Sequence, residues 1–147
     1  MIRVLLVDDH ASFRTNLQHM LESTGDIQVV ATAASGVEAI AHAAVQCPDV
    51  AIIDISMPFM DGIEAARQIQ IVCRATRVMM LSILDQPEYV QRSLDVGAIG
   101  YVLKDEIGSD LLSAIHDLHI GKRYFSRKVA EIADKYFGRG DNNSWAG

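Results

Sequence analysis

Cysteine is scarce in this chain of 147 residues, which contains only Cys47 and Cys73. The two lie far apart and form no CxxC pattern, so the sequence predicts neither a zinc site nor a disulfide framework. We therefore expect two reduced thiols, as is typical of a cytoplasmic protein.

Basic clusters and long apolar stretches are missing as well. The 13 lysines and arginines are outnumbered by 19 aspartates and glutamates, which gives a net charge of -6 without any basic run. Such a chain is a poor candidate for binding nucleic acid through its phosphates. The apolar run before Asp8 is only four residues long, too short for a signal peptide. No apolar stretch approaches the roughly 20 residues of a membrane span.

What the chain does contain is enough apolar material for one sizeable core. Half of its residues are hydrophobic and 22% are charged, which is typical of a folded globular domain. A length of 147 residues corresponds to about one domain. Because folding at this length removes roughly 70% of the unfolded chain's surface from water, the core needs no disulfide or structural metal to stabilise it.

Five short apolar runs alternate with five segments of helical periodicity. The runs are rich in Val, Ile and Leu, as expected of strands that are covered on both faces. They span Ile2–Val7, Ile27–Ala33, Val50–Ile53, Arg77–Leu81 and Ile99–Leu103. The helical segments span Ser12–Glu22, Gly36–Val45, Gly62–Val72, Pro87–Gly97 and Ser109–Gly121. This alternation predicts an α/β fold with a doubly wound, five-stranded parallel sheet.

Polar residues directly follow four of the five apolar runs. They are Asp8 and Asp9 after the first run, Asp54 after the third, Ser82 after the fourth and Lys104 after the fifth. In doubly wound sheets, ligands bind beyond the carboxyl ends of the strands, where the strand order reverses. A reversal between the first and third strands would bring the three aspartates together. Taken singly, Asp8 or Asp9 could instead be a helix cap.

Three neighbouring carboxylates indicate a cation site. They destabilise a fold unless a positive charge offsets them, and oxygen ligands without nitrogen or sulfur favour Mg²⁺. Lys104 adds a positive charge at the same edge, and Ser82 adds a hydroxyl. Mg²⁺, an amine and a hydroxyl around one carboxylate are suited to holding a phosphoryl group on that carboxylate.

Four motifs, in this order, resemble the receiver domain of bacterial two-component response regulators. They are Val7-Asp8-Asp9-His10, the stretch DISMPFMDG from Asp54 to Gly62, Leu81-Ser82, and Gly100-Tyr-Val-Leu-Lys104. The resemblance covers residues 1–121 and implies the strand order 2-1-3-4-5. The first and last motifs are most similar to the NarL/FixJ subfamily, whose members usually carry a DNA-binding helix-turn-helix domain after the receiver.

The resemblance implies a role for each residue that matches a motif. Asp54 corresponds to the phosphoacceptor, Asp9 to the direct Mg²⁺ ligand and Asp8 to its partner in holding the ion. The other matches are Ser56, whose backbone carbonyl ligates the metal, Lys104, which pairs with the phosphoryl group, Ser82, the switch hydroxyl, and Tyr101, the aromatic that swings inward when that hydroxyl moves. Leu84 lies where water would attack the phosphorylated Asp54, so we expect it to affect the rate of autodephosphorylation.

The resemblance also implies partners. A sensor histidine kinase would donate the phosphoryl group, and homodimers through the face of the fourth helix, fifth strand and fifth helix are common in such proteins. The chain would be a signalling switch that catalyses only its own phosphorylation and dephosphorylation. Control of transcription would need an output domain that this chain lacks, because residues 122–147 resemble a linker helix and a polar tail. Whether the chain is truncated or naturally has a single domain stays open.

One residue departs from the receiver pattern. Many receivers have a proline after the site lysine, joined by a cis peptide bond, whereas this chain has Asp105. A cis bond before a residue other than proline costs about 2.5–4 kcal/mol. The Lys104–Asp105 bond could therefore be either a trans or a strained cis bond.

Three other functions fit parts of the pattern. A Mg²⁺-dependent phosphatase of the haloacid dehalogenase type would need a second aspartate where this chain has Ser56. A flavodoxin-like cofactor-binding protein would need a phosphate-binding loop after the first strand, where Asp8 and Asp9 would repel a phosphate. The third is a receiver that has become an unphosphorylated interaction module. Tyr101, for its part, could simply be a half-exposed strand aromatic.

Overall fold

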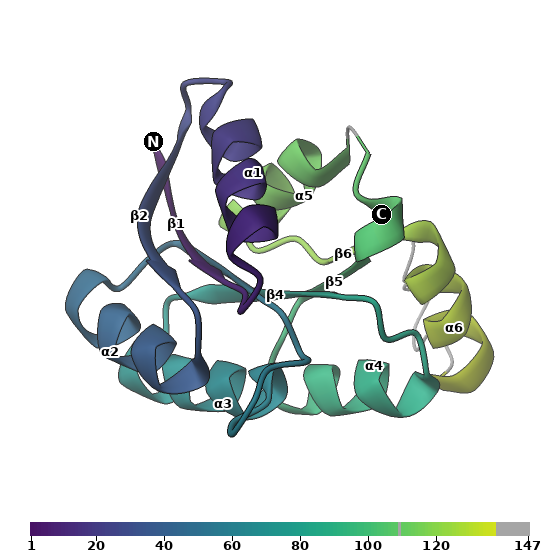
Figure 1. Cartoon of the computed structure of the whole chain (residues 1–147). Coiled ribbons are helices and arrows are strands. Elements are labelled where there is room, and N and C mark those ends of the chain that lie inside the picture. Colours follow the sequence, from purple (N-terminus) through teal and green to yellow (C-terminus); the bar gives the residue numbers. More distant parts are fainter. Residues whose placement is uncertain (109, 138–147) are drawn as a thin grey trace.

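The centre of the protein is a six-stranded parallel sheet in the order β2-β1-β3-β4-β5-β6 (Figure 1). The structure, a computed structural model, describes residues 1–108 and 110–137. The strands are β1 (Ile2–Val7), β2 (Ile27–Ala33), β3 (Val50–Ile53), β4 (Arg77–Ser82), β5 (Gly100–Leu103) and β6 (Tyr124–Phe125). The order of the first five strands confirms the predicted topology.

Helices cover both faces of this sheet. They are α1 (Ala11–Glu22), α2 (Gly36–Gln46), α3 (Gly62–Val72), α4 (Pro87–Asp95), the 3-10 turn η1 (Lys104–Glu106), α5 (Asp110–His119) and α6 (Arg127–Phe137). Figure 1 shows α1 and α5 on one face of the sheet and α2, α3 and α4 on the opposite face. One apolar cluster lies under α1 and α5, and a second lies under α2, α3 and α4. The predicted doubly wound α/β fold is therefore confirmed. None of the helices described is both long enough and apolar enough to cross a membrane.

The central strands are buried on both faces. In β1, Leu5 and Val7 belong to the cluster under α2, α3 and α4, whereas Val4 and Leu6 belong to the cluster under α1 and α5. Successive side chains of a strand point to opposite faces of the sheet. Burial on both faces explains why the strands read as continuous apolar runs rather than as alternating patterns.

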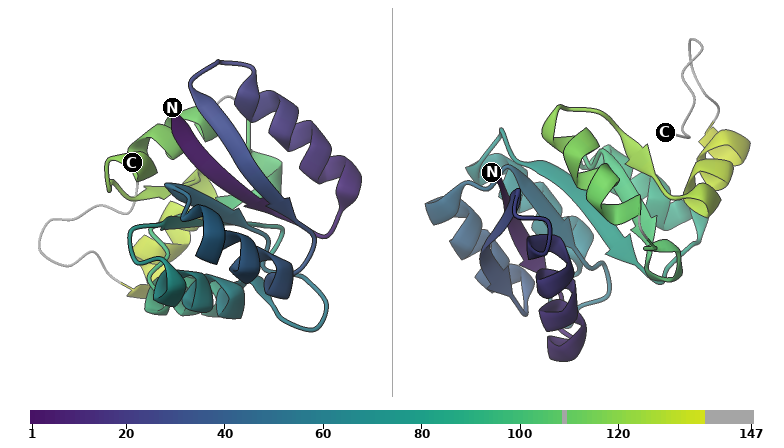
Figure 2. Two further views of the ribbon diagram at one scale, coloured as in Figure 1. Left: turned by 90° about the vertical axis from the view of Figure 1, so that its left-hand side faces the viewer. Right: turned by 90° about the horizontal axis from the view of Figure 1, so that it is seen from above.

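The sixth strand was not predicted from the sequence. Tyr124 and Phe125 pair with Gly100 and Tyr101, so β6 extends the sheet at the edge farthest from β2 (Figure 2). A strand of two residues is too short to stand out as an apolar run. The helix expected after residue 121 is present as α6, and it packs against α4 and β5. The polar tail predicted from residue 138 lies outside the described residues, and the domain boundary at residue 121 stays a prediction.

The expectation of two separate thiols is wrong. Cys47 and Cys73 form a disulfide, with their Cα atoms 5.6 Å apart. Each cysteine is the C-terminal cap of a helix, Cys47 of α2 and Cys73 of α3. Because α2 and α3 pack on the same face of the sheet, their C-terminal ends meet there. A separation of 26 residues along the chain does not reveal this proximity.

The peptide bond that follows β5 has the ordinary trans geometry. The described residues contain no cis peptide bond, so the Lys104–Asp105 bond is trans, and the turn η1 begins at Lys104. The helix that follows begins at Asp110. Its predicted cap, Ser109, lies outside the described residues.

Candidate functional site

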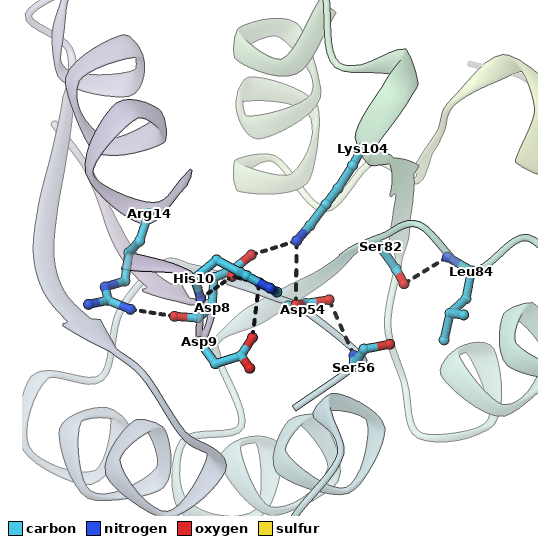
Figure 3. Close-up of polar contacts among 9 residues, drawn as sticks. All are labelled: Asp8, Asp9, His10, Arg14, Asp54, Ser56, Ser82, Leu84 and Lys104. Atoms are coloured by element: carbon cyan, nitrogen blue, oxygen red, sulfur yellow. Dashed lines mark hydrogen bonds and ion pairs between the residues drawn. The ribbon is translucent and has the colours of Figure 1, made fainter. Parts of the chain in front are cut away.

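The acidic residues meet because β1 and β3 are neighbours in the sheet. Val7 pairs with Ile53 in the parallel register, so Asp8 and Asp54 emerge side by side at the carboxyl edge (Figure 3). The backbone N–H of Asp54 donates to the carbonyl of Val7 at 2.9 Å, which joins the two strand ends. The prediction that a reversal of strand order gathers the acidic residues is confirmed.

Asp8, Asp9 and Asp54 form an acidic cluster. One ligand atom from each of them, and one from His10, all lie within 4.8 Å of one another. The residues Asp8 and Asp54 are only 1% and 3% exposed. Buried carboxylates this close repel each other strongly, so the cluster needs a positive charge nearby.

Lys104 supplies a positive charge. Its Nζ lies 2.8 Å from Oδ2 of Asp8 and 3.4 Å from Oδ2 of Asp54 (Figure 3). The same ammonium group lies 4.4 Å from the centre of the Phe13 ring, within the range of a cation–π contact. Lys104 comes from the end of β5, as the sequence predicts, and Phe13 lies in the first turn of α1.

Burial is the largest influence on the pKa of Asp54. Removal from water raises the pKa of its carboxyl group above the ordinary value of 3.8, and the neighbouring charge of Asp8 raises it further. The ammonium group of Lys104 and the backbone N–H of Ser56, which donates to Oδ1 at 3.2 Å, act in the opposite direction. The carboxylate of Asp54 is therefore held between opposing influences, and any cation added to the cluster would favour its charged form.

Asp9 has a carboxylate oxygen that fits a metal ion. Its Oδ1 is buried and accepts no hydrogen bond from the described residues. The imidazole of His10 lies 3.2 Å from this atom, without the geometry of a hydrogen bond, and its side chain is largely exposed. A buried oxygen without a donor, beside two further carboxylates, matches the oxygen ligands that Mg²⁺ prefers. The acidic cluster is thus consistent with the Mg²⁺ site of a receiver.

Two residues at the start of α1 hold Asp8 in place, and the sequence analysis gave them no such role. The backbone N–H of His10 donates to Oδ1 of Asp8 at 2.8 Å, and Nη1 of Arg14 donates to the carbonyl of Asp8 at 2.5 Å (Figure 3). The sequence signal for them is weak, because His10 simply follows the acidic pair and Arg14 lies one helical turn after His10. Both are positioning residues, because their hydrogen bonds fix the end of β1.

The glycine that opens α3 lies against the phosphoacceptor candidate. A Cβ atom at Gly62 would collide with the backbone carbonyl of Asp54. The Gly62 N–H donates to the carbonyl of Ile55 at 2.8 Å, so the loop after β3 folds back tightly onto its own strand. This close approach of two backbone segments requires glycine.

Ser82 and Tyr101 meet the backbone of the loop after β4. The Leu84 N–H donates to Oγ of the buried Ser82 at 3.0 Å, and the Tyr101 hydroxyl donates to the Leu84 carbonyl at 2.5 Å. Tyr101 is only 1% exposed, so the alternative of a half-exposed strand aromatic is wrong. Burial raises the pKa of its hydroxyl well above the ordinary value of 10.0. Its ring is already turned inward in this structure.

A cavity of about 360 Å³ opens above Asp54. Its lining residues come from four segments: His10, Ser12, Phe13, Asp54, Ser56, Ile83 and Lys104. Ile83 lines this cavity and is 74% exposed, whereas Leu84 packs against the apolar cluster under α4. The sequence pattern predicts water access at Leu84 and gives no signal for Ile83, because the turn after β4 decides which of the two side chains faces the cavity.

Comparison with known proteins identifies the family. Residues 4–116 match the response regulator receiver domain. The chain belongs to this family. A receiver domain is a signalling module rather than a conventional enzyme, so the phosphatase and flavodoxin-like interpretations are set aside.

Individual relatives agree with this membership. The chain is 36% identical over 145 residues to the response regulator GacA of Pseudomonas viridiflava, covering 98% of this chain and 68% of GacA. It superimposes on the receiver domain of the response regulator NarL from Mycobacterium tuberculosis with a TM-score of 0.78 and 35% identity, covering 82% of this chain and 98% of that one.

A more distant relative has been captured on DNA. RcsB is 26% identical with a TM-score of 0.82, covering 91% of this chain and 68% of RcsB, and its structure contains two RcsB dimers bound to two parallel DNAs. The predicted similarity to the NarL-like subfamily is confirmed by these relatives.

Proposed function

We propose that this receiver domain is a phosphorylation-controlled switch, and that Asp54 accepts a phosphoryl group from a sensor histidine kinase. One observation carries the proposal: a buried carboxylate lies at the floor of an open cavity, between the oxygens of the acidic cluster and the ammonium group of Lys104. Phosphoryl transfer depends mostly on positioning and on neutralising charge. These groups provide both around a single carboxylate nucleophile.

The acidic cluster would hold Mg²⁺. The side chains of Asp9 and Asp54 and the backbone carbonyl of Ser56 would ligate the ion, and Asp8 would help to hold it. When bound, Mg²⁺ neutralises the charge on phosphoryl oxygens. Lys104 already contacts Asp54 and would pair with the phosphoryl group once the aspartate is modified.

The loop after β4 would carry the signal. A phosphoryl group adds a charge of about -1.5 to -2 and three acceptor oxygens. The hydroxyl of Ser82 would turn toward one of these oxygens, which weakens its hydrogen bond with the Leu84 N–H. Because Tyr101 donates to the Leu84 carbonyl, a shift of this loop changes the environment of the buried ring. Phosphorylation would act by selecting the loop arrangement that contacts the phosphoryl group better.

Dimerisation and transcription control extend the proposal to the whole regulator. RcsB occurs as dimers on DNA, and we propose that this receiver also forms homodimers, through α4, β5 and α5. The edge of β5 is paired with β6, and α6 packs against α4. A dimer through this face would therefore include α6 or rearrange it. Binding to DNA would require an output domain like those of the longer relatives, and a cytoplasmic location stays a prediction.

The decisive experiment is chemical phosphorylation. The protein incubated with Mg²⁺ and acetyl phosphate is expected to gain about 80 Da by intact mass spectrometry. Asp54→Asn should gain nothing, whereas Asp95→Asn, an exposed aspartate on α4, should behave as the wild type. The absence of an adduct in the wild type would favour the unphosphorylated interaction module. An adduct that persists in Asp54→Asn would place the phosphoacceptor elsewhere.

A further inference from the structure

The disulfide lies apart from the phosphoacceptor site and has no role in the proposed switch. Cys47 follows α2 and Cys73 follows α3, at the end of each helix that precedes the next strand of the sheet. Asp54 lies at the opposite edge, where the strands end. We propose that Cys47–Cys73 is a reversible redox site, which small thiols such as glutathione open and glutathione disulfide closes.

The backbone positions allow both states. Each cysteine N–H completes the last turn of its own helix, from Cys47 to the Ala43 carbonyl at 2.9 Å and from Cys73 to the Ile69 carbonyl at 2.8 Å. A Cα–Cα distance of 5.6 Å lies in the middle of the range that disulfides span. These backbone hydrogen bonds do not involve the sulfurs, so breaking the disulfide does not remove the last turn of either helix.

The two cysteines differ in their exposure to solvent. Cys47 is exposed, at a turn with a left-handed φ of 41°, whereas Cys73 is only 4% exposed. We therefore expect an incoming thiolate to attack the sulfur of Cys47 and to release the sulfur of Cys73 as the leaving group. This asymmetry gives the exchange a defined first step.

The exchange balances in two steps. A glutathione thiolate attacks Cys47, forms a mixed disulfide there and releases Cys73 as a thiolate, which takes up the proton lost by glutathione. A second glutathione thiolate attacks the glutathione sulfur of the mixed disulfide and releases Cys47. In total two glutathione molecules are oxidised to one glutathione disulfide, and two protein thiols are formed. Oxidation runs through the same steps in reverse.

Opening the bond would loosen one face of the molecule. The disulfide joins the C-terminal ends of α2 and α3. The N-terminal ends of both helices lie against the loop after Asp54. Gly62 opens α3, and Gly36 at the start of α2 packs against the Met60 side chain of that loop. A link that spans 26 residues restricts the unfolded chain considerably. We expect reduction to lower the melting temperature by about 5–10 °C.

The test uses the wild-type chain in buffers of graded glutathione and glutathione disulfide. After acid quenching, unfolding and alkylation, intact mass should show two alkyl groups per chain in reducing buffers and none in oxidising buffers. The melting temperature should rise together with the oxidised fraction. Two alkyl groups at every ratio, or a melting temperature that does not follow the oxidised fraction, would overturn the proposal.

Single variants test the difference in access. In native protein treated with glutathione disulfide, Cys73→Ser should gain one glutathione at the exposed Cys47, whereas Cys47→Ser should stay unmodified because Cys73 is buried. Equal modification of the two variants would contradict the proposed order of attack. The double serine variant should melt at the same temperature in all buffers, which assigns the redox effect to this pair. None of these readouts depends on phosphorylation of Asp54, so the two proposals can fail separately.

Discussion

Asp9 illustrates how a single side chain can favour function over stability. Its buried Oδ1 accepts no hydrogen bond from the described residues, and it lies beside the carboxylates of Asp8 and Asp54. A buried acceptor without a donor destabilises a fold by about 1–3 kcal/mol. Repulsion among the three carboxylates adds to this effect.

We therefore expect Asp9→Asn to raise the free energy of unfolding by about 1 kcal/mol in the absence of divalent ions. Urea denaturation in the presence of a chelator would measure this change. Added Mg²⁺ should stabilise the wild type more than the variant, since the variant offers the ion one charge fewer. Asp95→Asn serves as the surface control, and a loss of stability in Asp9→Asn would contradict the argument.

Ile83 and Leu84 are adjacent but face different surroundings. Ile83 lines the cavity above Asp54, and the Leu84 side chain packs against the apolar core. We expect Ile83→Ala to admit water more readily and to shorten the lifetime of the phosphorylated protein several-fold. Leu84→Asn and Leu84→Glu are also expected to alter this lifetime. Decay measured by quantitative phosphate-affinity electrophoresis would compare them, and an unaltered decay in Ile83→Ala would show that this side chain does not control access.

At the level of elements, α6 is attached by apolar burial more than by charge. Val129 of α6 is fully buried, whereas the ion pair of Lys128 with Asp85, with 2.6 Å between Nζ and Oδ2, is largely exposed. Exposed ion pairs contribute little to stability. Val129→Ala should lower the free energy of unfolding by about 2 kcal/mol, and Lys128→Gln should unfold close to the wild type. Denaturant titration of both variants would test the contrast, which fails if Lys128→Gln proves the more damaging change.

An ion pair between His116 and Asp26 joins α5 to the turn before β2. The Nε2 atom of His116 lies 2.6 Å from Oδ2 of Asp26, and its Nδ1 lies 2.7 Å from the Leu112 carbonyl. Because both ring nitrogens face acceptors, the protonated ring is favoured. The Leu112 carbonyl, and then Asp26, raise the pKa of His116 above its ordinary value of 6.5. The pKa of Asp26 is lowered from 3.8, first by the hydroxyl of Thr24 and then by His116.

These shifts predict a pH dependence of stability. The contribution of His116 is complete below pH 6.5 and is lost as the pH rises through its raised pKa. The contribution of Asp26 is present above pH 3.8 and is lost as the pH falls through its lowered pKa. His116→Gln should therefore destabilise the protein more at about pH 5.5 than at about pH 9. The difference should be small, because both side chains are about half exposed, and equal destabilisation at both pH values would refute it.

For the whole molecule, the sequence was sufficient to predict the order of the first five strands and the gathering of acidic residues at the carboxyl edge of the sheet. Buried parallel strands read as apolar runs, and the rule that ligands bind at their carboxyl ends pointed to Asp54 and Lys104. The disulfide was missed because contact between Cys47 and Cys73 depends on how two helices pack. β6 was missed because two residues carry no periodicity. Ile83 was missed because the conformation of a turn decides which side chain lines a cavity.

Self-association is the property that belongs to the whole molecule. If homodimers form through α4, β5 and α5, phosphorylation should increase the mass measured by light scattering toward that of two chains, and Asp54→Asn should not respond. Hydrogen exchange in α6 should then change together with the mass, because α6 packs against α4 and β5. A dimer that forms without any change in α6 would place the interface on another face.

Gly62 has a consequence for how the protein can evolve. Any side chain at this position would occupy the volume already filled by the main chain of Asp54. In a library of all substitutions at Gly62 that is selected only for a soluble, folded product, no replacement should be tolerated. The same result is expected when the library is made in the Asp54→Asn background. The restriction at residue 62 is steric, so it should persist in descendants that abandon phosphate chemistry altogether.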